Sequence, residues 1–465
     1  MKAKGNAGKS SIVEFVLLVF LFGATIAGFL FRSDGGINLD TLFYVRQAID
    51  LPKIESNLFP LGYPVLLRAV HFFCSDYFWA GKILNGFCLL AILAFSWRRN
   101  FYFRETCILL CTKAGIGLLP FSFSEVPFLT LLYFLIFLLH SYFQNRPVKG
   151  WLFWMLLVFS GLILLRHSGI FLYPPFGLAG LLLFVRKGKA AFVEDKLWFW
   201  FLGLSATLLT IYLAWNFKSF GSLFGENLRG APEAMSHSEW MSHIFLNLKG
   251  LLGSANPFFS LVFQHGDAGL IGWLAMLPDL FFAGLMFWLF WKVGTGEFPK
   301  MLLIFALIFL CLMFLASLKA GIEVLNTRLL SPGLWLLYFA FLISFSSKIK
   351  PQFLFSLAFF SLFINLAFLL KTPAAYLKIR ERARLDLARK PEAKYFVVDK
   401  DHLPLSSYPI PFTGKVLEYQ HPVLAQSYIN RHALMMLRPE LQELDSLSAL
   451  LIPETQILRN SDCGN

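Results

Sequence analysis

The chain has 465 residues, of which 57% are hydrophobic and 15% are charged. A soluble domain carries about 25% charged residues, and a chain this apolar lacks the polar groups to cover a surface in water. The composition therefore excludes a water-soluble globule and indicates an integral membrane protein. The net charge of +13 would suit a nucleic-acid-binding protein, but in a membrane protein the basic residues are first compared with the topology.

The hydrophobic pattern predicts an all-α polytopic membrane protein with about eleven transmembrane helices. A span needs about 20 mostly apolar residues to cross the hydrocarbon core. The first span follows three lysines and is expected to remain as a signal anchor, because no clear cleavage site of small residues follows it. The expected spans are residues 12–31, 78–97, 105–120, 126–143, 151–166, 169–185, 197–215, 270–291, 301–317, 329–346 and 351–370.

The basic residues are distributed unevenly between the two sides of these spans. With the N-terminus in the cytoplasm, the inner segments carry 16 Lys and Arg in 48 residues, and the outer connections carry 10 in 120. This asymmetry follows the positive-inside rule, so the positive charge needs no anionic partner and no nucleic-acid partner is expected. The two long loops, 32–77 and 216–268, are then expected on the extracytoplasmic face.

The composition changes after residue 370. Residues 371–465 carry 13 Lys and Arg against 11 Asp and Glu. We therefore predict two domains, a transmembrane domain of residues 1–370 and a small soluble α/β domain of residues 371–465 on the outer face. Its expected elements are a helix at 376–390 and a strand at 395–398.

The first outer loop carries a carboxylate in a helical pattern. Asp40, Tyr44 and Ala48 are spaced as on one face of a short helix, so Asp40 lies near its N-terminal end, just outside the membrane. A carboxylate there can take a proton from an acceptor or bind a metal. Capping of the helix by the Asp40 side chain is the structural alternative, and both roles can coexist.

This pattern resembles the C-type glycosyltransferase superfamily. The resemblance rests on Asp40 after the first span, Tyr44 four residues later, and Pro60-Leu-Gly-Tyr63-Pro64 before the second span. Members such as the protein O-mannosyltransferases and the lipid A aminoarabinose transferases are multi-span enzymes that use sugar donors on polyprenyl phosphates. The resemblance implies that Asp40 is the catalytic acid of the first outer loop. Many members have Asp-Glu where this chain has Asp40-Thr41, so no second acid, and no metal bound by one, is implied there.

Other charged residues at the outer face agree with this resemblance. Ser124-Glu125 opens the fourth span, and the alternative for Glu125 is a helix N-terminal acid capped by Ser124. Arg166, followed by His167, lies in the outer turn after the fifth span, where it can bind the donor phosphate, pair with a carboxylate, or extend to lipid headgroups.

Two further bases precede the tenth span. The segment Glu323 to Pro332 resembles the superfamily's Arg-Tyr…Pro element, with Leu329 in place of Tyr. Arg328 in this segment offers a planar fork of donors for a phosphate near the headgroup level. Lys319 can assist by charge, although a role as an interfacial anchor is the alternative.

The 216–268 loop supplies the remaining candidates. His237, Glu239 and His243 form a weak metal pattern, because histidines six residues apart do not share a helix face. His265 and Asp267 precede the eighth span at the face where the other candidates meet, which favours them as site-lining residues together with Tyr44, Tyr63 and His167. No Walker loop, GxGxxG or HExxH motif occurs, and the cysteines show no metal-type CxxC spacing.

The sequence thus predicts an inverting glycosyltransferase of a bacterial cytoplasmic membrane with its site on the extracytoplasmic face. Asp40 would deprotonate the acceptor, Arg328 and Arg166 would hold the departing polyprenyl phosphate, and Glu125 would orient groups in the cavity. The acceptor is a lipid, a glycan or a protein, and a divalent cation is a possible cofactor. The alternative function is a secondary transporter or lipid-carrier flippase, but mid-span charges are few, with Lys113 the clearest, and this distribution favours an enzyme that works at one face. A glycan polymerase or ligase of another membrane family is a third interpretation.

Overall fold

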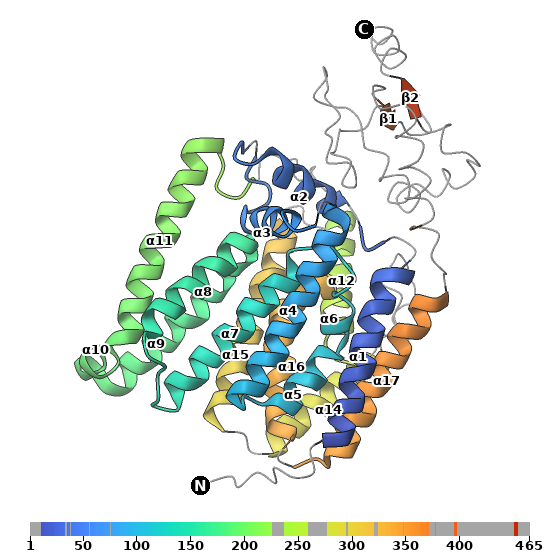
Figure 1. Ribbon diagram of the computed structural model, residues 1–465. Coiled ribbons are helices and arrows are strands. Elements are labelled where there is room, and N and C mark those ends of the chain that lie inside the picture. The colour runs from blue at the N-terminus through green and yellow to red at the C-terminus, as the bar shows by residue number, and fades with distance from the viewer. Residues whose placement is uncertain are drawn as a thin grey trace.

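The computed structural model describes residues 11–32, 35–37, 39–54, 56–74, 76–225, 237–258, 277–293, 296–319, 324–346, 348–371, 377, 395–397 and 451–453. These residues form a helical bundle (Figure 1). Its first half contains α1 (Ser11–Phe31), α2 (Leu39–Asp50), α3 (Gly62–His71), α4 (Tyr77–Arg99), α5 (Phe103–Leu110), α6 (Lys113–Ile116), α7 (Glu125–Phe143), α8 (Trp151–Leu165), η1 (His167–Leu172) and α9 (Tyr173–Lys187). The second half contains η2 (Gly188–Ala190), α10 (Ala191–Glu194), α11 (Lys196–Phe220), α12 (His237–Ser254), α14 (Leu277–Val293), α15 (Glu297–Lys319), α16 (Thr327–Phe345) and α17 (Pro351–Lys371).

Several helices have the length and composition of membrane spans. Seven helical stretches in the described part of the chain are long and apolar enough to cross a membrane: Ile12–Phe31, Tyr77–Arg99, Glu125–Phe143, His167–Glu194, Lys196–Phe220, Glu297–Leu318 and Thr327–Phe345. Trp151–Leu165 and Pro351–Ala367 are shorter apolar helices. The prediction of a mostly helical membrane protein is confirmed, and the count of eleven spans stays a prediction.

The expected span at 105–120 is wrong as a single helix. α5 ends at Leu110, Thr112 has an extended backbone (φ −69°, ψ 161°), and α6 is one short turn. Groups from other helices satisfy the interrupted backbone, since the Lys113 amide donates to the Pro257 carbonyl and the Trp335 indole donates to the Ala114 carbonyl, both at 2.9 Å. Hydropathy indicated a span because it measures how apolar the side chains are and does not detect a break in a helix. Irregular backbone of this kind is tolerated where it is buried in protein.

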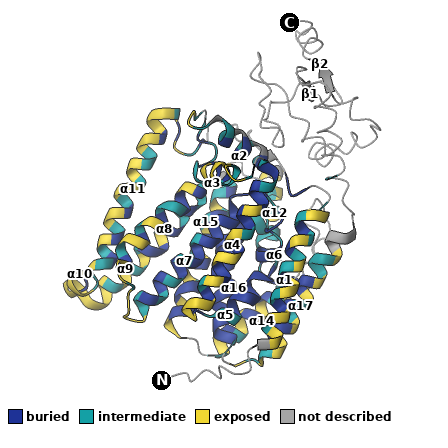
Figure 2. Cartoon of the chain, in the orientation of Figure 1, coloured by how far each residue is buried: buried dark blue, intermediate teal, exposed yellow. Residues whose placement is uncertain are grey.

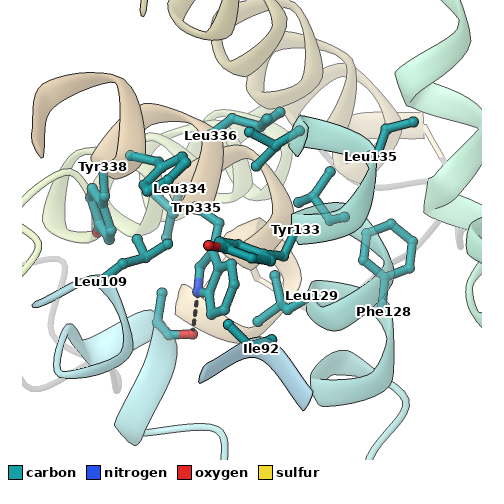
Figure 3. Packing of buried hydrophobic residues seen from close by; sticks show 14 of the residues in the cluster. Ile92, Leu109, Phe128, Leu129, Tyr133, Leu135, Leu334, Trp335, Leu336 and Tyr338 are labelled. Atoms are coloured by element: carbon teal, nitrogen blue, oxygen red, sulfur yellow. Dashed lines mark hydrogen bonds between the residues drawn. The ribbon is translucent and has the colours of Figure 1, made fainter. Parts of the chain in front are cut away.

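α16 forms the centre of the bundle. Its residues from Leu329 to Phe345 are all buried, and it packs against α5, α7, α14 and α15 (Figure 2). Trp335 lies among Tyr133 of α7, Leu129 and Ile92, and the dashed line in Figure 3 marks its hydrogen bond to Ala114. A helix that is apolar on every side and surrounded by other helices is the expected core of a large bundle.

The helices at the periphery of the bundle expose apolar side chains. α1 packs beside α17, and α11 leaves Trp200, Ile211 and Phe217 about 60% exposed (Figures 1 and 2). Large exposed apolar surfaces are rare on soluble proteins but suit a lipid environment. The exposed faces therefore agree with an integral membrane protein.

The two long loops, 32–77 and 216–268, contain helices of their own. Residues 32–77 include α2, as the spacing of Asp40, Tyr44 and Ala48 predicted. The sequence did not predict α3 in the same loop, nor α12, which residues 237–254 of the 216–268 loop form. α12 packs against α14, α15 and α16.

Of the C-terminal domain, the structure describes little more than one strand pair. β1 (Tyr395–Val397) matches the predicted strand and pairs antiparallel with β2 (Leu451–Pro453). Apart from Leu377, the predicted helix at 376–390 lies outside the described residues. The soluble α/β domain therefore stays a prediction.

Candidate active site

Four of the predicted site residues meet at the end of the bundle across which α2 and α3 lie (Figure 1). Asp40 lies in the first turn of α2 and Glu125 is the first residue of α7. Arg166 follows the last residue of α8, and Arg328 lies in the first turn of α16. We refer to these four side chains as the charge cluster.

The charge cluster is a chain of alternating charges. Arg328 Nη1 donates to Asp40 Oδ2, and Arg166 Nη1 forms an ion pair with Glu125 Oε1. Arg328 Nη1 also lies 3.9 Å from Glu125 Oε1, which links the two pairs. The arginines and carboxylates are equal in number, so the cluster is formally neutral.

The four side chains of the charge cluster differ in their exposure to solvent. The side chain of Glu125 is 2% exposed and that of Arg166 is 13% exposed, whereas Arg328 and Asp40 reach 18% and 28%. Asp40 is thus the more accessible carboxylate of the cluster. Glu125 is the deeper one and contacts both arginines, which suits an orienting role.

The start of α16 and the segment before α7 position Arg328. The Asn326 side chain caps α16 by accepting from the Leu329 amide at 3.1 Å. The Arg328 guanidinium lies 5.1 Å from the ring centroid of Phe123, which stacks on Phe121 at 4.9 Å. A cation over an aromatic face gains electrostatic attraction, and it holds the planar fork in one orientation.

Glu125 begins α7, as its structural alternative expected, but the cap by Ser124 and the extension of Arg166 to lipid headgroups are wrong. The Ser124 side chain makes no capping hydrogen bond to α7, and its hydroxyl instead shares a 3.0 Å hydrogen bond with the hydroxyl of Tyr44. Arg166 does not simply extend to headgroups, because its guanidinium is paired with Glu125 inside the protein.

Tyr44 and Tyr63 lie buried beside the cluster. Their rings meet edge to face with centroids 4.8 Å apart. Burial, and to a smaller extent the charge of Glu125, raises the pKa of Tyr44 above its ordinary value. Burial likewise raises the pKa of Tyr63. Both phenols are therefore neutral at physiological pH, and they support the site rather than act as bases.

His167 connects two outer segments. Its Nε2 donates to the Asn57 carbonyl at 3.0 Å, and the Asn57 side chain in turn binds Ser222. This places His167 at the margin of the site, next to the 32–77 loop.

Of the other predicted site residues, the structure describes only part. Lys319 ends α15, but its side chain is not among those described, and His265 and Asp267 lie outside the described residues. His243 Nε2 donates to the Ser317 carbonyl at 3.1 Å. In the described part of the chain, no group of three or more His, Cys, Asp or Glu side chains is arranged to hold a metal ion.

Sequence reasoning missed one buried cation near the site. Lys82 of α4 is 1% exposed, and it contacts the segments that precede α2 and α7. The signal was present, since a lysine inside the apolar run at 78–97 is costly unless it is paired or functional.

The sequence matches no protein-family model and no curated protein. Among solved structures, the chain is similar to ArnT from Cupriavidus metallidurans in the apo state, with a TM-score of 0.43 and 11% sequence identity over 81% of this chain. The match covers 64% of the ArnT chain, so this protein spans less than two thirds of its length.

Proposed function

We propose that this protein is an integral membrane glycosyltransferase that moves a sugar from a polyprenyl-phosphate donor to an extracytoplasmic lipid, glycan or protein acceptor. The observation that carries this proposal is the charge cluster. Four elements that are distant in sequence bring Asp40, Glu125, Arg166 and Arg328 to one end of an apolar bundle. A carboxylate beside two guanidinium groups supplies the base and the phosphate contacts that such a transfer needs.

The reaction can be written with these groups as a single displacement. Asp40 takes the proton from an acceptor hydroxyl or amine, and the acceptor atom attacks the anomeric carbon opposite the phosphate. The bond between that carbon and the phosphate oxygen breaks, and the electron pair leaves with the polyprenyl phosphate. Arg328 and Arg166 stabilise the charge that develops on this phosphate, and the anomeric configuration inverts.

A divalent cation does not fit the cluster as it stands. Both carboxylates are already held by guanidinium groups, Asp40 by Arg328 and Glu125 by Arg166. The neighbouring guanidinium groups would repel a cation bound to these carboxylates, and among the described residues no group of three or more His, Cys, Asp or Glu side chains is arranged to hold one. We therefore derive the transfer from the side chains of this chain alone.

The test is transfer from a labelled polyprenyl-phosphate sugar in membranes that contain equal amounts of wild-type protein or Asp40→Asn. Asn keeps the size and capping ability of Asp but removes the base, so we expect the rate to fall by about 10²- to 10⁴-fold. Asp76→Asn is the matched control, because Asp76 caps α4 by accepting from the Phe78 amide at 3.0 Å and Asn caps equally well. Wild-type transfer by Asp40→Asn would refute the role of Asp40.

One observation favours the alternative of a transporter or flippase. Lys113 Nζ donates to the Gly253 carbonyl at 2.6 Å and interacts electrostatically with the fully buried Asp279, whose Oδ1 accepts from Asn256 at 3.0 Å. Ionisable residues buried among membrane helices often mark a transport path. Movement of a labelled polyprenyl phosphate across proteoliposomes, lost in Asp279→Asn, would support this function. Transfer without flux would support the enzyme.

A further inference from the structure

Two short segments carry the carboxylates of the site into place. We name residues 35–37, which precede α2 and Asp40, the first strap, and residues 119–123, which precede α7 and Glu125, the second strap. The straps contact each other, since the Ser122 amide donates to the Gly36 carbonyl at 3.0 Å. Gly36 has a φ of +67°, and a Cβ atom there would clash with the Pro120 carbonyl, so this contact requires glycine.

Both straps are bound by α4. Lys82 Nζ donates to the Gly35 carbonyl of the first strap at 2.6 Å and to the Pro120 carbonyl of the second. One turn later, Asn85 Nδ2 donates to the Leu119 and Phe121 carbonyls of the second strap at 2.9 and 2.5 Å. Lys82 is thus the side chain on this helix that holds the two straps together.

The burial of Lys82 is energetically expensive. The side chain is 1% exposed, and its ammonium lies 5.2 Å from the centroid of the Phe78 ring. A buried charge needs compensating hydrogen bonds, and the three donors of an ammonium group can serve carbonyls from different segments at once. Replacement by an apolar side chain would leave the Gly35 and Pro120 carbonyls without this shared donor.

We propose that Lys82 is a positioning residue for the transfer reaction. Its ammonium joins the first and second straps and so sets the separation between Asp40 and Glu125. This inference rests on the proposed function, because it assigns Lys82 a part in the geometry of that same site. Lys82 acts through the straps, so its loss should affect turnover more than donor binding.

The variants separate positioning from general stability. Lys82→Met keeps the length of the side chain and removes the ammonium, and Lys82→Arg keeps a charged donor. Gly36→Ala opens the strap contact without changing any charge. Leu93→Ala is the matched control, because Leu93 is a buried apolar residue of the same helix.

The first readout is steady-state transfer from the labelled polyprenyl-phosphate sugar, together with thermal unfolding. Misplacement of reacting groups by about 1 Å costs about 10²-fold in rate, so we expect kcat to fall by about that factor in Lys82→Met and in Gly36→Ala. KM for the donor should change far less, and Lys82→Arg should recover part of kcat. Leu93→Ala should lower the melting temperature and keep kcat. A kcat for Lys82→Met equal to that of Leu93→Ala would overturn the proposal.

The second readout does not depend on activity. Hydrogen exchange should rise in peptides that cover residues 35–44 and 117–126 in Lys82→Met and stay unchanged in Leu93→Ala. Unchanged exchange in Lys82→Met would overturn the role of Lys82. If the wild type transfers sugar in the same experiment, the proposed function is still supported. Raised exchange with a wild type that transfers no sugar would support the link between the straps and refute the transfer reaction.

Discussion

The ion pair between Arg166 and Glu125 offers a direct measurement of how much the charge cluster contributes to stability. Arg166→Met keeps the apolar stem and removes the guanidinium, which leaves a carboxylate that is 2% exposed with Arg328 3.9 Å away. Loss of one partner of a buried pair costs about 3–5 kcal/mol. Because Arg166 itself is 13% exposed and Arg328 remains nearby, we expect the lower end of that range, about 3 kcal/mol.

A double-mutant cycle isolates the interaction. Glu125→Gln removes the charge that Arg166→Met leaves unpaired, so the double variant should recover about 1–3 kcal/mol relative to the sum of the single changes. The assay is denaturant-induced unfolding of the purified protein in detergent, followed by tryptophan fluorescence. Arg146→Met, at an exposed position after α7, is the control and should change stability by less than about 0.5 kcal/mol. Additive single variants, or an Arg166→Met no less stable than the control, would refute the pairing.

Three further expectations follow from individual contacts. Because burial raises the pKa of Tyr63, the folded state keeps a proton that the unfolded chain loses near pH 10. The folded state therefore loses stability as the pH rises, and the melting temperature of the wild type should fall more steeply than that of Tyr63→Phe between about pH 9 and 11. Asn57→Ala removes the 2.8 Å and 3.1 Å hydrogen bonds to Ser222, which should speed hydrogen exchange at residues 221–225. Tyr338→Phe removes a buried donor to the Ser254 carbonyl and should cost about 1 kcal/mol in detergent unfolding with transfer unchanged.

The sequence predicted long apolar helices well, because the membrane imposes a simple length requirement. The expected spans 78–97, 126–143 and 329–346 correspond to α4 (Tyr77–Arg99), α7 (Glu125–Phe143) and α16 (Thr327–Phe345). The interrupted segment at α5 and α6 was not predictable from hydropathy. Its breaks are stabilised by groups such as the Pro257 carbonyl, which are distant in sequence.

The residues of the charge cluster were predictable one by one, but their pairing was not. Glu125 stands out because a charged residue at the end of an apolar run is costly unless it is solvated, paired or functional. Asp40 stands out through its helical spacing and the family resemblance, and Arg166 and Arg328 through their places in that resemblance. Which acid meets which base depends on how the helices pack, and Asp40 and Arg328 are 288 residues apart. Lys82 could have been found as a charge inside the apolar run at 78–97, but its acceptors could not, because they are main-chain carbonyls that no side-chain pattern reveals.

The ion pairs of the charge cluster suggest an order in which the donor and the acceptor would bind in the proposed transfer. In the proposed transfer, a donor phosphate that pairs with the Arg328 guanidinium would weaken its ion pair with Asp40, the most exposed carboxylate of the cluster. The released Asp40 can then accept a hydrogen bond from the acceptor hydroxyl or amine, which it cannot do as readily while it is paired. Glu125 keeps Arg166 in place during this exchange, since that pair is more deeply buried. In the proposed transfer, the more exposed pair of Asp40 and Arg328 would open for the phosphate, and the buried pair of Glu125 and Arg166 would keep the site in place.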